Sequence, residues 1–358
     1  MQHFHRLTVD EVRRETDECV SLRFAVPPTL AETFRFHPGQ HLTLRMTLGG
    51  EEVRRSYSVC SALDEGELRV AVKRVAGGRF SSWANQALAA GDTLELLPPA
   101  GHFGPPLEPG RAKTWLAIAA GSGITPVISI LASALAREPG SRALLFYGNR
   151  THDSIMFREA LEDLKNRHMA RFSLFHVLSR ERREIELLSG RIDRAKLVAA
   201  AGTLFHPAEI DHALLCGPAG LIDEARATLT ELGVAPARIS VELFAVPDSP
   251  AAVSGASAAE AVAGASARVT VQRDGVRTTF DAPLAGAAIL DAAARTGLEL
   301  PFSCKGGVCA TCRCKLVSGR VAMARNYALA PWEIEAGYIL ACQARPLTDA
   351  VTLDFDAA

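Results

Sequence analysis

The chain has 358 residues, of which 48% are hydrophobic and 22% charged, with 39 basic against 40 acidic side chains. This length predicts two or three domains, because single hydrophobic cores rarely grow beyond about 250–300 residues. The composition excludes collagen-like, disordered and heavily membrane-embedded proteins. The net charge of −1 argues against nucleic-acid binding as the main task, since that task usually requires a strongly basic surface.

The sequence gives no sign of export or of a membrane span. The N-terminal residues are followed by charges and lack the apolar core of a secretory signal, so we expect a cytoplasmic protein. The longest uncharged run, 114–136, is divided by Gly121, Gly123 and Pro126 into a strand, a turn and a helix. In a protein that is not exported, grouped cysteines are more typical of metal binding or redox chemistry than of disulfides.

The first hundred residues predict a small antiparallel β-barrel. Short runs such as 42–46 and 68–72 alternate apolar and polar side chains, with Gly, Pro and Asp between them. Several such strands at close spacing are typical of a barrel.

From about Thr114 the pattern changes to alternating strands and helices, which predicts an α/β domain with a doubly wound parallel sheet. The expected strands are 115–120, 143–147, 172–178 and 212–216, and the expected helices are 126–137, 155–167 and 220–232.

A stretch rich in Ala, Ser, Gly and Pro follows at 247–267, and we expect it to be a flexible linker. Beyond it, strands at 268–273 and 277–280 and a helix at 289–295 predict a third, compact domain. The expected division is a barrel at 1–108, a nucleotide domain at 109–246, the linker, and a final domain at 268–358.

The strongest signal in the sequence is a cluster of cysteines. Four residues separate Cys304 from Cys309, two separate Cys309 from Cys312, and 29 separate Cys312 from Cys342. This spacing is typical of a plant-type [2Fe–2S] cluster, which we expect these four thiolates to bind. Structural zinc is the alternative, although zinc sites usually pair two short cysteine hooks. Cys314 breaks the spacing, and we expect a buried structural side chain there rather than an alternative ligand.

Two glycine turns in the middle domain predict a nicotinamide-nucleotide site. The strand at 115–120 runs into Gly121-Ser-Gly and then a helix, with Thr125 expected as N-cap and Pro126 in the first turn. Such a turn lets a pyrophosphate approach the backbone and the helix N-terminus. The third glycine of the dinucleotide fingerprint is absent, but Cys216-Gly-Pro after another strand supports the same site.

Arginines after two strands of this domain favour NADPH, with NADH as the alternative. Arg150 follows one strand, Ser179 and Arg180 follow the next, and Arg191 comes shortly after. Ligands bind at the carboxyl ends of such strands, and guanidinium groups match a 2′-phosphate.

Two short motifs in the barrel, 55–58 and 77–82, resemble those of the ferredoxin–NADP reductase family. The resemblance implies that Arg55 holds the FAD pyrophosphate, Tyr57 stacks on the flavin ring and Ser58 approaches its N5 atom. It places Gly78 and Ser81 in a second phosphate-facing turn. The other positions that it implies are Lys73 and Val75 along the flavin, Cys216 and Glu242 in the active site, and Phe244 in place of the family's usual Tyr beside the nicotinamide.

The order of domains narrows the resemblance to oxygenase reductases that end in a ferredoxin domain. The expected fold of that last domain is an α+β β-grasp. Four further segments look like reductases whose partner is the di-iron phenylacetyl-CoA epoxidase: 147–150, 155–158, 176–181 and 326–329. The implied path runs from NADPH through FAD and [2Fe–2S] to the oxygenase component of a multicomponent monooxygenase. A Rieske-type ring or steroid hydroxylase as acceptor, a stand-alone reductase and a zinc-bearing binding module remain as alternatives.

Overall fold

The structure, a computed structural model, describes residues 3–244, 265–284 and 286–357. These residues form two compact units, one of which comprises Phe4–Val53 and Tyr57–Leu243 and the other His3, Arg54–Ser56 and the described residues after Leu243. Residues 245–264, which include most of the expected linker, lie outside the described residues. Among those described, no helix combines the length and apolar character that crossing a bilayer requires.

The N-terminal domain is a six-stranded antiparallel barrel, as the alternating pattern predicts. Its strand order is β4-β3-β6-β1-β2-β5, and a bridge between Val59 and Val70 connects the two edge strands. The elements are β1 (His5–Thr16), β2 (Cys19–Ala25), β3 (His41–Leu48), β4 (Glu51–Ser58), β5 (Leu68–Lys73), α1 (Arg79–Gln86) and β6 (Thr93–Leu96). Inward-facing side chains such as Leu22, Leu44 and Val70 form an apolar core.

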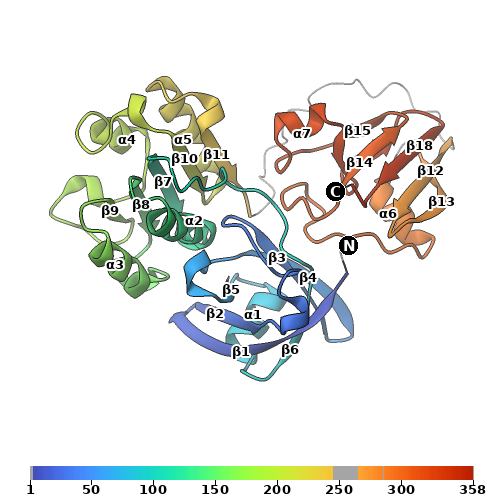
Figure 1. Cartoon of the computed structure of the whole chain (residues 1–358), viewed down its shortest axis with the longest axis horizontal. Helices are drawn as coiled ribbons and strands as arrows, with labels where there is room; N and C mark the ends of the chain where they lie inside the picture. Colours follow the sequence, from blue (N-terminus) through green and yellow to red (C-terminus); the bar gives the residue numbers. More distant parts are fainter. Residues whose placement is uncertain (1–2, 245–264, 285, 358) are drawn as a thin grey trace. The chain divides into compact units, whose positions relative to one another are not determined.

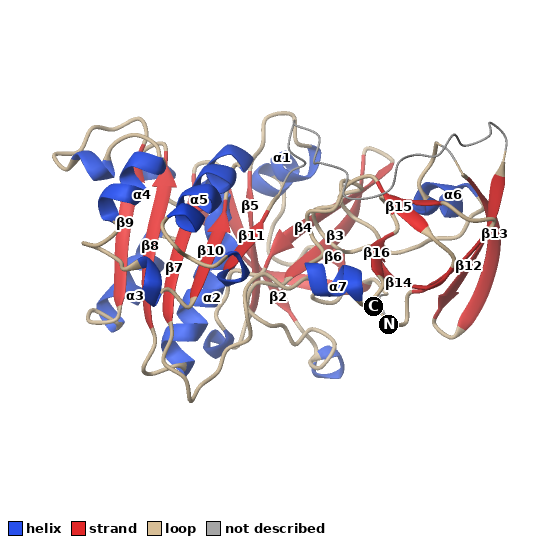
Figure 2. Cartoon of the chain, turned by 90° about the horizontal axis from the view of Figure 1, so that it is seen from above, coloured by secondary structure: helices blue, strands red, loops and turns tan. Residues whose placement is uncertain are grey.

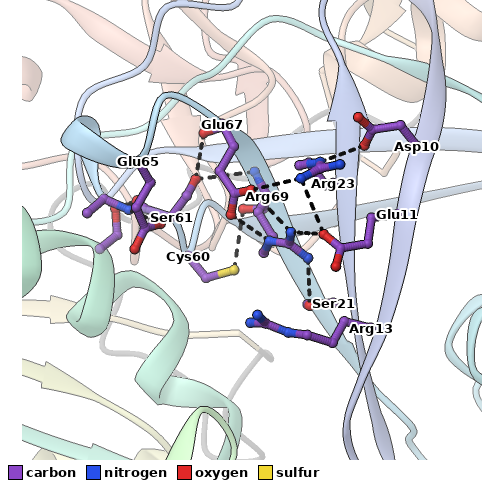
Figure 3. A network of polar contacts seen from close by, with 12 residues as sticks. Asp10, Glu11, Arg13, Ser21, Arg23, Cys60, Ser61, Glu65, Glu67 and Arg69 are labelled. Atoms are coloured by element: carbon purple, nitrogen blue, oxygen red, sulfur yellow. Dashed lines mark hydrogen bonds and ion pairs between the residues drawn. The ribbon is translucent and has the colours of Figure 1, made fainter. Parts of the chain in front are cut away.

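A polar network on the barrel connects three of its strands (Figure 3). Arg69 on β5 is buried and donates from Nε to Glu67 Oε1 at 2.7 Å and from Nη1 to Ser21 Oγ on β2 at 3.1 Å. It also pairs with Glu11 on β1. Because buried charges are tolerated only when they are paired, this network fixes the positions of β1, β2 and β5 relative to one another.

The middle domain is a doubly wound α/β domain with a five-stranded parallel sheet in the order β11-β10-β7-β8-β9. Figure 2 shows these strands side by side with helices on both faces. The strands are β7 (Thr114–Ala120), β8 (Arg142–Asn149), β9 (Phe172–Leu178), β10 (His212–Cys216) and β11 (Ile239–Glu242), and the helices are α2 (Ile124–Arg137), α3 (Arg158–Arg167), α4 (Arg194–Ala200) and α5 (Ala219–Glu231). Helices α2 and α3 share one apolar core with the sheet, and α4 and α5 share another.

Two helix starts in this domain differ by more than one residue from the sequence-based expectation. Helix α3 begins at Arg158 rather than Ile155, because Phe157 has a left-handed backbone with a φ of 56° and residues 155–157 are buried. Helix α2 begins at Ile124, so the prediction of Thr125 as N-cap is wrong. Gly123 takes that place, and the Thr125 hydroxyl donates to Ser122 O at 3.0 Å.

The last domain (orange to red in Figure 1) is the expected α+β β-grasp domain, with a mixed sheet in the order β13-β12-β18-β14-β16. Strands β12 and β18 are parallel, and the other neighbours are antiparallel. The elements are β12 (Ser266–Arg273), β13 (Val276–Pro283), α6 (Ile289–Arg295), β14 (Arg313–Ser318), β15 (Val321–Met323), α7 (Pro331–Glu335), β16 (Tyr338–Leu340), β17 (Ala344–Pro346) and β18 (Ala350–Asp354). Helix α6 packs on the sheet in a core that includes Cys312, Cys314 and Cys342.

Candidate functional site

The fold brings the two flavin motifs of the barrel together. Arg55 and Tyr57 lie on the same strand, β4, and the ring of Tyr57 lies 5.5 Å from that of Phe80, at the start of α1. Tyr57 is only partly buried, and Arg55 is exposed, with Nη1 donating to Arg54 O at 2.7 Å. An aromatic ring with accessible surface and an exposed guanidinium fit a ring system joined to a pyrophosphate.

The second motif forms a tight turn before α1. Gly77 has a φ of 71°, and a Cβ at Gly78 would lie 2.4 Å from Ser81 Oγ and 3.1 Å from Val75 O. Ser81 Oγ accepts the Val75 N–H at 3.1 Å, which closes the turn. The first turn of α1 contains no acidic residue, so its N–H groups and partial positive charge suit a phosphate. These residues therefore fit a flavin nucleotide.

The nucleotide turn lies where the order of the parallel sheet reverses, between β7 and β10. A Cβ at Gly123 would lie 2.1 Å from Cys216 O, so the turn after β7 packs directly on the end of β10. Gly121 has a φ of 54°, and its carbonyl accepts the Tyr147 hydroxyl at 2.9 Å. Lys73 at the end of β5 also reaches this turn, because its Nζ lies 3.7 Å from where a Gly121 Cβ would be. Open α/β sheets bind ligands at such a switch point.

Ser58, Cys216 and Glu242 meet at the same end of the sheet. Cys216 and Glu242 are register partners on β10 and β11, with Sγ 4.0 Å from Oε2. Ser58 Oγ, from the barrel, donates to the same Oε2 atom at 3.2 Å. The three residues that the family resemblance implies for the active site therefore come from distant parts of the chain into one constellation.

The electrostatics of this constellation favour neutral groups. Glu242 keeps some accessible surface, but the protein packed around its carboxyl disfavours the charge and raises its pKa to about 8, against a smaller opposing effect of the Ser58 hydrogen bond. Burial raises the pKa of the Cys216 thiol well above its usual value. At neutral pH the site therefore contains a protonated carboxyl beside a thiol that is a poor nucleophile.

The arginines expected near the ribose lie together at the ends of β8 and β9. The backbone N–H of Arg180 donates to Arg150 O at 2.8 Å, and that of Gly190, next to Arg191, donates to Leu178 O at 2.8 Å. Arg150, Ser179, Arg180 and Arg191 are all exposed. Within residues 3–244, none of these three arginines makes an ion pair with a carboxylate.

Pro126 lies in the first turn of α2, beside the glycine turn, and Phe244 is the last residue described before residue 265. The side chain of Phe244 is 44% exposed. Its role beside the nicotinamide stays a prediction.

In the last domain the four cysteines of the spacing rule come together as two pairs. Contact with the Cys309 thiol lowers the pKa of Cys304 to about 5, and contact with Cys312 lowers that of Cys342. Cys304 is exposed, and the other three are buried. Among the described residues, no three His, Cys, Asp or Glu side chains gather as ligands of a single metal ion. Two pairs of thiols fit a two-iron cluster.

The loop around these cysteines directs hydrogen-bond donors at sulfur. Gly306 N–H donates to Cys304 Sγ at 3.3 Å, and Cys342 N–H donates to Cys312 Sγ at 3.4 Å. Such donors stabilise thiolates and the negative charge of a bound cluster. Cys314 is buried in β14, and burial raises the pKa of its thiol, as expected for a structural residue.

Two residues of the site were not predicted from the sequence. Gln343 Nε2 donates to Cys342 Sγ at 3.5 Å and to Lys305 O at 2.8 Å, so it connects both parts of the cluster site. Its position directly after the last cysteine was the only signal for it. Tyr147, whose hydroxyl donates to Gly121 O in the nucleotide turn, lies in the segment 147–150 that carries a family resemblance, but the resemblance gave it no role in the site.

Comparisons with known proteins agree with this geometry. Family models match an oxidoreductase FAD-binding domain at 6–104, an oxidoreductase NAD-binding domain at 117–227 and a 2Fe-2S iron-sulfur cluster binding domain at 271–347. The chain is 46% identical over 357 residues to one of the subunits of 1,2-phenylacetyl-CoA epoxidase from Escherichia coli (strain K12), covering 100% of this chain and 99% of the relative. The chain belongs to the ferredoxin–NADP reductase family.

Other members of the family share the whole architecture. The ferredoxin reductase component of 3-ketosteroid-9-alpha-monooxygenase from Rhodococcus rhodochrous is 37% identical over 358 residues, covering 98% of this chain and 96% of the relative. A solved phthalate dioxygenase reductase has a TM-score of 0.59 at 24% identity, covering 98% of each chain, and shows the fold. The present chain is therefore an electron-transfer reductase that uses a nicotinamide nucleotide, FAD and a [2Fe–2S] cluster.

Proposed function

We propose that the chain is the reductase component of a multicomponent oxygenase and passes electrons from NADPH to the di-iron oxygenase component of phenylacetyl-CoA epoxidase. The observation that carries the proposal is the full-length, 46% identical relation to a protein of that epoxidase, which spans all three domains. Two features of the structure support the same electron path. The Ser58–Glu242–Cys216 constellation lies where the nicotinamide and the flavin are expected to meet, and the two thiol pairs lie where the iron–sulfur cluster is expected.

A bound flavin would supply hydride acceptance from the nicotinamide and one-electron donation to the iron–sulfur cluster. The protein would supply binding and orientation: Arg55 and the N-terminus of α1 would hold the pyrophosphate, and Tyr57 would offer a ring face. Glu242 holds a proton at neutral pH within hydrogen-bond distance of Ser58 Oγ. Cys216 stays a thiol and packs the end of β10 against the nucleotide turn.

The preference for NADPH rests on the exposed arginines at the ends of β8 and β9. A guanidinium binds a phosphate with two parallel hydrogen bonds, which a ribose hydroxyl does not match. We expect Arg180→Ala to lower kcat/KM for NADPH by about ten- to a hundredfold and to leave NADH almost unchanged. Arg226→Ala, on the exposed face of α5, is the control. Equal losses for both nucleotides would contradict the proposal.

The partner is tested by reconstitution with purified oxygenase components. We expect NADPH oxidation to become coupled to substrate oxidation with the di-iron epoxidase component, and Cys342→Ser to abolish the coupling. A Rieske-type hydroxylase is the second candidate, because relatives named for a ketosteroid monooxygenase match the full chain. Coupling with that hydroxylase but not with the epoxidase component would contradict the proposal and identify the hydroxylase as the electron acceptor.

The division into domains at 1–108, 109–246 and 268–358 is part of the proposal, and each matched family range falls inside one of these domains. A cytoplasmic location is also proposed. It is supported by the eight cysteines, all of which lie in the described residues and none of which forms a disulfide. Fractionation of cells, with the holoprotein followed by its visible absorption, tests the location.

A further inference from the structure

The charges of the ferredoxin domain are divided unevenly along its sequence. The segment 304–345, which carries the four cluster cysteines, has six basic side chains and two acidic ones, Glu333 and Glu335, whereas the flanking segments 268–303 and 346–358 together carry seven acidic and four basic side chains. Glu333, one of the acids in the cluster-bearing segment, is buried, with Oε1 2.8 Å from Arg313 Nε. The cluster-bearing segment therefore has a positive surplus that the near-neutral total of the domain conceals.

Three of these cations surround the two-stranded sheet of β15 and β17. Arg320 and Arg325 flank β15 and are exposed, and Arg345 is partly exposed on β17, directly opposite Ala322. We call these three residues the arginine face. In the described ranges 265–284 and 286–357, none of the three makes an ion pair with a carboxylate. Their charge is therefore available to another molecule.

The arginine face adjoins the cluster loop through backbone contacts. Ala324 N–H donates to Gln343 O at 3.0 Å, next to Cys342, and Tyr327 N–H donates to Gly307 O at 3.1 Å. A Cβ at Gly307 would lie 3.2 Å from Arg325 O. Cys304 and Lys305, in the same loop, are exposed. An acceptor that approaches the exposed part of this loop therefore comes close to Arg325.

We propose that the arginine face docks the electron acceptor of this chain through an acidic surface on the oxygenase component. Opposite charges at the two surfaces raise the rate of encounter and orient the complex. The inference rests on the proposed function, because it needs an oxygenase as acceptor, and it adds the site of docking and the charge of the partner's surface.

The test uses the full-length holoenzyme with Arg320→Glu or Arg325→Glu, and the oxygenase component that the wild-type chain reduces. The dissociation constant is measured by calorimetry, and electron transfer to the oxygenase by rapid mixing, at low and high ionic strength. We expect each variant to weaken binding about five- to tenfold at low ionic strength. We also expect wild-type binding to weaken as salt is added, because salt screens exposed charges.

Arg277→Glu is the matched control, because Arg277 is exposed on β13, outside the cluster-bearing segment, and the change in charge is the same. We expect it to stay within about twofold of wild type, since it lies outside the arginine face. Reduction of the cluster by NADPH without oxygenase should be unchanged in all variants, which shows that the domain is intact.

Two results would overturn the docking proposal. One is equal binding by Arg325→Glu and Arg277→Glu. The other is slower reduction of the cluster by NADPH at unchanged affinity for the oxygenase, since the face would then serve the chain's own flavin domain. Failure of the proposed function is distinguishable from both, because the wild-type chain would then reduce neither oxygenase component.

Discussion

The protonation of Glu242 is the most informative feature at the scale of single residues. Its carboxyl meets Ser58 and Cys216 in a setting that raises its pKa to about 8. In the unfolded chain the same group titrates near 4.5, so between these two pH values the folded protein holds a proton that the unfolded protein has lost. The contribution of Glu242 to stability therefore falls as the pH rises from about 4.5 to about 8.

We predict that Glu242→Gln is as stable as wild type near pH 5 and more stable near pH 9. The expected gain in free energy of unfolding is on the order of 1–2 kcal/mol, reduced from the full linkage value because the side chain is partly exposed. Thermal unfolding across this pH range measures it. Glu162→Gln, exposed on α3, should show no such change with pH. A difference that does not vary with pH would contradict the account of Glu242.

The five cysteines near the C-terminus differ in role, and single substitutions separate them. Cys314→Ala should keep the visible absorption and iron content of the cluster, at a cost of about 1 kcal/mol for the small cavity. Cys312→Ala should lose both, because it removes one of the paired thiols. Iron analysis and absorption spectra of the purified proteins measure the effect. Loss of the cluster from Cys314→Ala would mean that Cys314 is a ligand.

That the spaced cysteines come together could be predicted from the sequence, because three of the four share one loop. The same holds for the glycine turns, where a Cβ would collide with backbone at Gly123. Gln343 and Tyr147 could not be predicted, since their roles arise from tertiary contacts that no local pattern encodes. Thr125 was predicted as the N-cap of α2, and this was wrong, because the helix starts one residue before it.

At the scale of elements, the periodicity of the sequence predicts β9, β10 and α6 with their bounds, and the interior of the nine other elements that it indicated, whereas α1, α4 and β11 were not predicted. Its failure at α3 has a physical cause: residues 155–157 are apolar and fit a helical face, but they pack into the core before the chain turns at Phe157. Strand order could not be read from periodicity. Strand order depends on which strands pair with one another, and the alternation of apolar and polar residues along one strand does not identify its neighbours.

One buried carboxylate stabilises the parallel sheet near the starts of β7 and β8. Glu138, at the end of α2, is fully buried and accepts from Lys113 Nζ at 3.1 Å, Trp115 Nε1 at 3.2 Å and Ser141 Oγ at 2.7 Å. We predict that Glu138→Ala lowers the free energy of unfolding by about 3–5 kcal/mol, because it leaves the Lys113 ammonium buried with a weaker partner. Denaturant unfolding measures the change.

Glu209→Ala is the control for this prediction, since the Glu209–Arg142 ion pair belongs to the same domain but is exposed. It should cost less than about 1 kcal/mol. Similar losses for the two variants would show that burial does not decide the strength of these pairs.

In the barrel, the network of Figure 3 makes a similar comparison possible on β-strands. Arg69 is 5% exposed at its side chain, whereas Arg23 in the same network is 38% exposed. We predict that Arg69→Met lowers the free energy of unfolding by about 2 kcal/mol or more and Arg23→Met by less than about 1 kcal/mol. Thermal unfolding of both variants tests this. The reverse order would contradict the role of Arg69 as the residue that fixes β1, β2 and β5.

At the scale of the whole molecule, each domain provides one part of an electron path. The barrel and the parallel sheet share the Ser58–Glu242 contact, so the expected flavin and nicotinamide sites belong to one unit. The β-grasp domain contains its own core and its own paired thiols. The chain has a net charge of −1 although its cluster-bearing segment is basic. The total charge therefore does not indicate which surface docks the electron acceptor.

The central claim is that a nicotinamide nucleotide reduces both a flavin and an iron–sulfur cluster in this one chain. Anaerobic titration of the purified holoprotein with NADPH, followed by absorption and electron paramagnetic resonance, tests it most directly. We predict that the flavin absorption bleaches and the resonance of a reduced [2Fe–2S] cluster develops, and that Cys342→Ser retains the first change and loses the second. A colourless protein, or a cluster that stays oxidised while the flavin is reduced, would contradict the account.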